Sequence, residues 1–267
     1  MCRSPKISHI LVTALALMTF ISGQSFLFDQ TLSDSLPQSN ANSIKIADVN
    51  RDGIHDVIIS GYDESRYGVF LDVDYGTVEG SIVSGLEYEF ITYPDTIGEY
   101  IGGLGNVTLA DVNRDGNVDA YLNGSARSYL LINLLDGFEF STGIDDLTLT
   151  YSNANFADVD MNGTPDLFIM GVDETQDLIL NRLYINDGSR LNYDQTPNFP
   201  DLINGTSEWV DYDNDGDQDL LISGNTADYK SSVTRFFKNE PSGRLIEDTN
   251  QDLIGLKLIW MEIFSLM

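Results

Sequence analysis

Short apolar runs alternate with clusters of Asp, Asn and Gly along most of this 267-residue chain. Residues 57–60 and 167–170 are typical, because they consist mainly of aliphatic and aromatic residues and are bounded by polar, turn-forming ones. Such short runs predict β-strands. After residue 24, no stretch keeps apolar residues at the i, i+3, i+4, i+7 spacing of an amphipathic helix. The pattern therefore predicts an all-β protein.

A nine-residue polar segment occurs four times and aligns without gaps. It spans residues 48–56, 111–119, 158–166 and 211–219; we call these segments loops 1 to 4 and number their residues as positions 1 to 9. Each loop precedes an apolar run and a glycine, and successive loops start 63, 47 and 53 residues apart. Repeats of this length are typical of β-propeller blades. They predict a β-propeller with four recognisable blades, as a whole ring or part of a larger one, with a linear array of small calcium modules as the alternative.

A second apolar run follows the first in every repeat. These second runs are residues 69–71, 129–132, 183–185 and 235–237. The third one is followed by Asn-Asp-Gly-Ser at residues 186–189, a sequence typical of a hairpin turn. Several short strands per repeat favour a propeller over a β-sandwich.

The four loops have the composition of a metal-binding turn. Asp or Asn occupies positions 1, 3 and 5, glycine occupies position 6, and Asp occupies position 9 in every copy. Because glycine permits a sharp turn, oxygens from positions 1, 3, 5 and 9 and the main-chain carbonyl of position 7 can surround one ion. Oxygen donors favour calcium over zinc or copper, and magnesium, which retains its waters, fits less well. Asx-rich turns that form without any metal are the alternative.

Position 12 excludes an EF-hand. That motif requires a bidentate Glu at position 12 and a helix on each side of the loop. Position 12 is Ile59, Leu122, Ile169 or Ile222, and each lies in a predicted strand.

The pattern D-x-[DN]-x-[DN]-G-x-x-D before an apolar strand resembles the FG-GAP/VCBS repeats of integrin alpha-chain propellers and many secreted bacterial proteins. Residues 184–188 and 209–217 are especially similar to that family, and the resemblance covers residues 26–260. It implies that each loop joins two strands of one blade and holds one Ca²⁺. The implied ligands, with position 7 contributing its carbonyl, are Asp48, Asn50, Asp52, Ile54, Asp56, Asp111, Asn113, Asp115, Asn117, Asp119, Asp158, Asp160, Asn162, Thr164, Asp166, Asp211, Asp213, Asp215, Asp217 and Asp219.

The N-terminal segment has the organisation of a secretory signal peptide. Arg3 and Lys6 precede an apolar run over residues 10–21, which is short for a bilayer span. We expect residues 1–24 to be the signal peptide, 25–40 an outer strand and linker, and 41–267 the propeller repeats. We therefore expect a secreted or cell-surface protein with no membrane span after cleavage.

Both ends of the chain contain fragments of the repeat. Residues 28–31 are similar to residues 193–196, and residues 252–260 are similar to residues 201–209. No further loop follows residue 260, so we expect the last unit to be truncated. An incomplete ring would expose sheet edges and thereby favour self-association.

Composition excludes several classes of partner and of catalytic centre. Asp and Glu outnumber Lys and Arg by 42 to 14, and the formal net charge of −28 disfavours nucleic acid and anionic membranes as partners. His55 is the only histidine after residue 24, and it occupies position 8 of loop 1, which is not a ligand position. The mature chain has no cysteine, and its one histidine lies within loop 1. These two facts exclude Cys-His and Ser-His-Asp centres.

These observations predict a non-catalytic extracellular scaffold that is stiffened by calcium and binds a protein or a glycan. The alternative is an accessory or supporting domain of a secreted carbohydrate-active or other hydrolytic enzyme. That alternative requires a pair of carboxylates in a cleft away from the metal loops.

Overall fold

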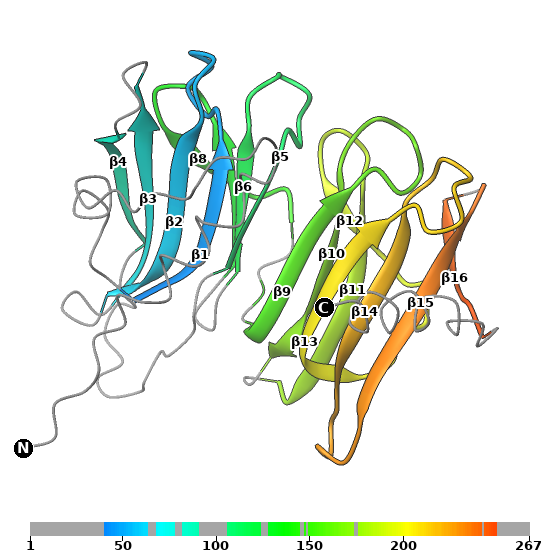
Figure 1. Cartoon of the computed structure of the whole chain (residues 1–267). Coiled ribbons are helices and arrows are strands. Elements are labelled where there is room, and N and C mark those ends of the chain that lie inside the picture. The colour runs from blue at the N-terminus through cyan, green and yellow to red at the C-terminus, as the bar shows by residue number, and fades with distance from the viewer. Residues whose placement is uncertain are drawn as a thin grey trace, which may run out of the picture. The chain divides into compact units, whose positions relative to one another are not determined.

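The computed structural model describes residues 40–63, 68–77, 82–90, 106–123, 128–144, 147, 149–173, 176–241 and 243–249. Within these ranges the regular structure consists of sixteen β-strands in four antiparallel sheets, with no helix (Figure 1). The four sheets are the blades of a β-propeller, so the predicted fold class is confirmed. Membrane-spanning helices are likewise absent from the described part of the chain.

Each blade is a meander of four strands that pair in chain order. Blade 1 contains β1 (Asn40–Ala47), β2 (Asp56–Asp63), β3 (Gly68–Gly76) and β4 (Ile82–Phe90). Blade 2 contains β5 (Asn106–Ala110), β6 (Asp119–Asn123), β7 (Tyr129–Asn133) and β8 (Phe138–Ser141). Blade 3 contains β9 (Thr150–Ala157), β10 (Asp166–Asp173), β11 (Leu178–Asn186) and β12 (Leu191–Asp194). Blade 4 contains β13 (Leu202–Val210), β14 (Asp219–Thr226), β15 (Ser232–Glu240) and β16 (Arg244–Glu247).

The predicted apolar runs are the second and third strands of the blades. The first run of each repeat lies in β2, β6, β10 or β14, and the second run lies in β3, β7, β11 or β15. The hairpin turn at residues 186–189 is also confirmed, because the Asp187 N–H donates to the Arg190 carbonyl (3.1 Å) and Gly188 has a φ of 88°. The fragments at residues 28–31 and 252–260 lie outside the described residues.

The second strand of a central blade is buried on both faces. In β10, Leu167 and Ile169 pack in a cluster with residues of blade 2, whereas Phe168 and Met170 pack in a cluster with residues of blade 4. All four side chains are at most 1% exposed. Burial on both faces explains why the sequence has continuous apolar runs at these strands instead of an apolar–polar alternation.

Three apolar clusters join consecutive blades, one at each of the three interfaces. Each cluster includes the valine at position 2 of a loop: Val49 between blades 1 and 2, Val112 between blades 2 and 3, and Val159 between blades 3 and 4. Burying one such aliphatic side chain stabilises the fold by about 1.5–3 kcal/mol. Loops 1, 2 and 3 are therefore anchored in the hydrophobic core.

The first strands of consecutive blades also contact one another: β1 contacts β5, β5 contacts β9, and β9 contacts β13. The contact between β9 and β13 is polar. Asn153 Oδ1 accepts hydrogen bonds from the N–H and the hydroxyl of Ser207 (3.0 and 2.6 Å), and Asn155 Nδ2 donates to the Ser207 carbonyl (2.6 Å). Trp209 lies next to these residues and packs edge-on against Phe168, with ring centroids 6.4 Å apart. Trp209 therefore contributes to the packing between blades 3 and 4.

Candidate metal centres

Each loop connects the first and second strands of its blade, and its position 9 is the first residue of the second strand. In all four loops the aspartate at position 1 accepts a hydrogen bond from the N–H of the glycine at position 6. The N···O distances are 2.8, 2.9, 2.8 and 3.2 Å in loops 1 to 4. This bond curls the backbone around the oxygens of positions 1, 3 and 5, as the sequence pattern predicts.

Two positions of every loop have left-handed backbone conformations. The glycines at position 6 have φ values of 84, 85, 86 and 98°, which glycine adopts at little cost. The residues at position 4 also have positive φ values, of 62, 61, 54 and 60°; they are Arg51, Arg114, Met161 and Asn214. Only Asn214 is of a type that favours this conformation, so residue type does not predict the backbone conformation at position 4.

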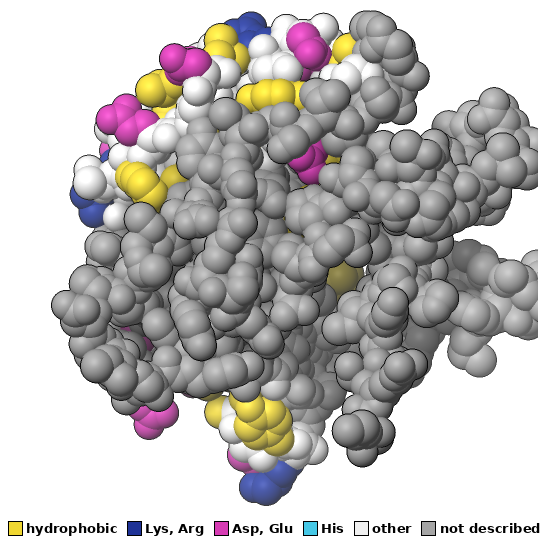
Figure 2. All heavy atoms as spheres, turned by 90° about the vertical axis from the view of Figure 1, so that its left-hand side faces the viewer, with side chains coloured by type: hydrophobic (Ala, Val, Ile, Leu, Met, Phe, Trp, Pro, Cys, Tyr) yellow, Lys and Arg dark blue, Asp and Glu magenta, His cyan; other side chains and the backbone are white. Residues whose placement is uncertain are grey.

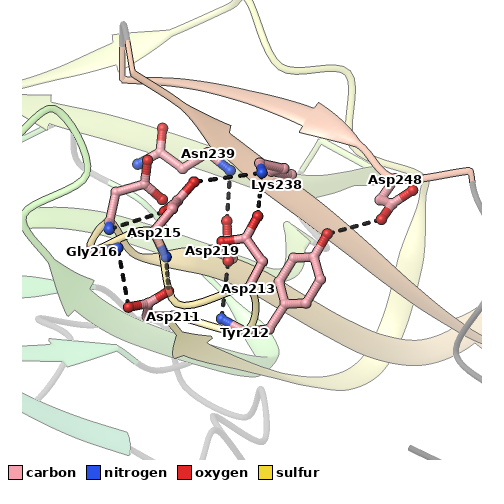
Figure 3. Close-up of polar contacts among 10 residues, drawn as sticks. Asp211, Tyr212, Asp213, Asp215, Gly216, Asp219, Lys238, Asn239 and Asp248 are labelled. Atoms are coloured by element: carbon pink, nitrogen blue, oxygen red, sulfur yellow. Dashed lines mark hydrogen bonds and ion pairs between the residues drawn. The ribbon is translucent and has the colours of Figure 1, made fainter. Parts of the chain in front are cut away.

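The aspartate at position 9 is fully buried in all four loops. One of its carboxylate oxygens accepts the N–H of position 2, at 2.9, 2.9, 2.8 and 3.1 Å in loops 1 to 4. The other oxygen accepts an N–H near the end of the third strand, at 3.0, 2.8, 2.8 and 2.8 Å. This aspartate, predicted only as a metal ligand, also fastens the loop to two strands of its blade (Figure 3).

The third-strand residue that binds position 9 also links neighbouring blades. It is Gly76 in blade 1 and an asparagine in the other three: Asn133, Asn186 and Asn239. Each asparagine donates from Nδ2 to the main-chain carbonyl at position 2 of the preceding blade's loop, at 2.7, 2.8 and 2.7 Å. We call these contacts the asparagine links.

The asparagine links differ in their side-chain oxygens. Asn133 and Asn186 each accept a hydrogen bond from the N–H two residues later, at 2.8 and 2.9 Å. Asn239 Oδ1 is buried without a partner, and the residue two positions later is Pro241, which has no N–H. The third link is therefore incompletely satisfied.

Arginines at position 4 form a second connection between loops. Arg114 of loop 2 donates from Nε to the carbonyl of Gly163 in loop 3 (2.8 Å). Arg51 of loop 1 donates from Nη1 to Asn117 Oδ1 in loop 2 (3.3 Å). Loops 1, 2 and 3 are thus connected in series by side chains of one loop that reach the next.

Two loops bring three carboxylates close enough to share one ion. The groups are Asp158, Asp160 and Asp166 in loop 3, and Asp211, Asp213 and Asp215 in loop 4; within each, one oxygen per residue lies within 4.8 Å of the others. Loops 1 and 2 have Asn at position 3, and no such group of three carboxylates is found in them.

Buried oxygens without partners indicate that a cation fits these two loops. Asp158 Oδ1 and Asp217 Oδ1 are inaccessible to solvent and have no hydrogen-bond partner. A carboxylate oxygen in that position is costly unless a cation compensates it. The donors are all hard oxygens, which suits a calcium-like ion. Position 1 of loop 3 and position 7 of loop 4 therefore have the properties expected around a bound cation.

In loops 2 and 3 the side chain at position 7 forms a hydrogen bond inside its blade. Asn117 Nδ2 donates to the Asn133 carbonyl (3.0 Å), and Thr164 Oγ1 donates to the Asn186 carbonyl (2.7 Å). Position 7 was predicted to contribute its main-chain carbonyl to an ion, and these side-chain contacts are compatible with that role. His55 is exposed, as expected for a residue at a non-ligand position.

Burial changes the acidity of the aspartates at position 9. Desolvation by burial raises the pKa of Asp119 and that of Asp166 to about 6, although hydrogen bonds from backbone N–H groups oppose the shift. Burial also raises the pKa of Asp219. Nearby loop carboxylates, such as Asp115 beside Asp119, raise the pKa further by repulsion. A cation in the loop would reverse this effect.

Comparisons with known proteins leave the family open. No known protein family matches the sequence. No curated protein matches it either. A solved structure that is similar is that of a lectin from Agrocybe aegerita, described as recognising non-reducing terminal N-acetylglucosamine. It is 15% identical with a TM-score of 0.46, and the match covers 78% of this chain but only 65% of the lectin chain. A likeness at this level identifies neither a family nor a ligand for this chain.

Replacing Asn186 by alanine should destabilise the protein by about 2–4 kcal/mol, because the Val112 and Pro165 carbonyls both lose the Nδ2 donor. Chemical denaturation of the purified variant measures the change. Asn198→Ala, which removes an exposed asparagine between β12 and β13, is the matched control and should cost less than about 0.5 kcal/mol. Equal effects of the two substitutions would contradict the importance of the asparagine link.

Replacing Met161 by asparagine should stabilise the protein by about 1 kcal/mol, because methionine at a φ of 54° is strained and asparagine tolerates this conformation. The reverse exchange in loop 4, Asn214→Met, should lower stability by a similar amount. Thermal unfolding of both variants checks the pair. Shifts of the same sign would show that backbone strain at position 4 is not the cause.

The metal-free protein should titrate at two of the position 9 aspartates with midpoints near pH 6, namely Asp119 and Asp166. A raised carboxyl pKa means that the folded state binds more protons than the unfolded state between about pH 4 and 6. The stability contributed by these groups therefore falls as the pH rises through that window. Carboxyl ¹³C NMR measures the midpoints directly, and values near 3.9, the usual pKa of aspartate, would contradict the effect of burial.

Proposed function

We propose that this chain is a secreted calcium-binding β-propeller of the FG-GAP/VCBS type, acting as a non-catalytic extracellular scaffold that binds a protein or a glycan. The observation that carries the proposal is the loop geometry, which recurs at the same place in four blades. The unpartnered buried oxygens of Asp158 and Asp217 support a cation at two of these places.

In this proposal each ion is held by the side chains of positions 1, 3, 5 and 9 and by the carbonyl of position 7. Calcium would contribute charge and coordination geometry, and so would offset the repulsion among clustered carboxylates. Position 2 and position 9 connect each loop to the core and to the third strand, so an ion would stiffen the blade as well as the loop. Such stiffening suits a scaffold without disulfides, since the only cysteine is Cys2, within the proposed signal peptide at residues 1–24.

The surface constrains the kind of partner. The exposed large apolar residues of the described part are spread over several blades and turns; examples are Phe140, Met161 and Tyr229. On the face in Figure 2, acidic, basic and apolar side chains of described residues are interspersed. With a formal charge of −28, the chain would attract cationic partners, repel anionic ones and leave the binding of neutral ones unopposed. A neutral glycan or a basic protein segment meets this condition.

Calcium should bind at about four sites with dissociation constants of about 10⁻⁴–10⁻³ M, the range of extracellular calcium modules. At 2 mM calcium, each site should then stabilise the folded state by about 0.6–1.8 kcal/mol. Thermal unfolding in calcium and in excess chelator, together with equilibrium dialysis, measures both quantities. Identical unfolding curves in the two conditions would contradict the proposal.

Substitutions distinguish a loss of calcium-dependent stabilisation from a loss of stability that does not depend on calcium. Asp52→Ala and Asp215→Ala should each lose part of the calcium-dependent stabilisation, and Gly116→Val should damage loop 2 because valine resists a φ of 85°. Asp201→Ala, which removes an exposed aspartate outside the loops, is the control and should retain the full calcium effect. A binding role is tested separately on glycan and protein arrays, where retention of the protein should require calcium.

A further inference from the structure

Loop 4 differs from the other loops in its charge and in what lies against it. It has Asp at positions 1, 3, 5, 7 and 9, whereas loops 1, 2 and 3 each have three aspartates. The third strand of blade 4 carries Lys238 immediately before Asn239. The corresponding residues, next to the other two linking asparagines, are Ile132 and Ile185. Blade 4 thus combines the most acidic loop with a basic residue in place of an apolar one.

The ammonium group of Lys238 lies against the same oxygens that an ion would use. Lys238 Nζ forms an ion pair with Asp213 Oδ2 and lies 3.5 Å from Asp215 Oδ2 (Figure 3). Both aspartates belong to the loop 4 group whose carboxylate oxygens lie within 4.8 Å of one another. The lysine side chain is 35% exposed, so water does not fully screen these contacts.

One lysine does not balance this loop. Asp217, which is 5% exposed, still has Oδ1 buried without a hydrogen-bond partner. The loop therefore has one cation against it and still contains a buried oxygen without a partner, and that oxygen requires a further donor or positive charge. A divalent ion would meet that requirement, but it needs the carboxylates of Asp213 and Asp215 that Lys238 engages.

We propose that Lys238 is a tethered cation that competes with the metal ion for Asp213 and Asp215, so that loop 4 binds calcium more weakly than it would without this lysine. This inference rests on the calcium-binding function proposed above. The ammonium group and a divalent ion repel each other at these distances, and Lys238 must leave the carboxylates before the ion is bound by them. Loops 1, 2 and 3 have no lysine or arginine at the corresponding third-strand position.

Competition of this kind affects the calcium concentration at which loop 4 fills. At low calcium, Lys238 partly neutralises loop 4 and keeps it curled. At higher calcium the ion displaces the ammonium group, which then no longer contacts Asp213 and Asp215.

Each loop contains its own reporter, the backbone N–H of the glycine at position 6. We expect a ¹H–¹⁵N NMR titration of the whole chain with CaCl₂ to move the signals of Gly53, Gly116, Gly163 and Gly216, each with its own midpoint. In Lys238→Met the Gly216 midpoint should fall about tenfold, because one repelling charge is removed from the site. The other three midpoints should not change.

Two further variants keep the test specific. Lys238→Ile introduces the residue type that blade 3 has at the equivalent position, Ile185. It should reproduce the effect of Lys238→Met. Lys230→Met removes an exposed lysine paired with Asp228 outside the loops, and it should leave all four midpoints unchanged. In chelator, Lys238→Met should unfold at a lower temperature than the wild-type protein, since loop 4 then has no neutralising charge.

The outcomes distinguish this inference from the function on which it rests. If no glycine signal moves with calcium, the proposed calcium function and this inference both fail. If Gly53, Gly116 and Gly163 respond but the Gly216 midpoint is the same in the wild type and in both Lys238 variants, only the role of Lys238 is overturned.

Discussion

A buried carboxylate is the interaction on which every blade depends. The aspartate at position 9 accepts one N–H from its own loop and one from the third strand, and it does so without access to solvent. Burying a charge this deeply is favourable only when hydrogen bonds and nearby positive charge compensate it. The loop and the third strand therefore depend on the same buried carboxylate, which each of them stabilises with an N–H donor.

The sequence predicted the repeating features well, because they are local. Glycine at position 6, the Asp or Asn residues of positions 1, 3 and 5, and the strands on either side follow from residue types within about a dozen positions. The asparagine links were missed because they join residues far apart in the chain: Asn133 and Val49 are separated by 84 positions. Lys238 was missed for the same reason, since nothing near it in sequence marks its approach to loop 4.

Backbone geometry in the loops is more uniform than their side chains. Position 4 has nearly the same φ in all four copies, although it holds Arg, Arg, Met and Asn. The bonds made by positions 1, 6 and 9 therefore determine the path of the chain, and position 4 is free to vary. In loops 1 and 2, position 4 is an arginine, Arg51 or Arg114, whose side chain donates a hydrogen bond to the following loop.

The asparagine links have a consequence for how the propeller comes apart. Each link runs from one blade to the loop immediately before it, and no blade is bonded in this way to a distant one within the described residues. Such an assembly is a one-dimensional array. Its free energy of unfolding is approximately the sum of the contributions of the single blades and of the junctions between neighbouring blades. Cutting one junction would divide the array into two shorter cooperative units, each unfolding at its own temperature, rather than weaken the whole molecule evenly.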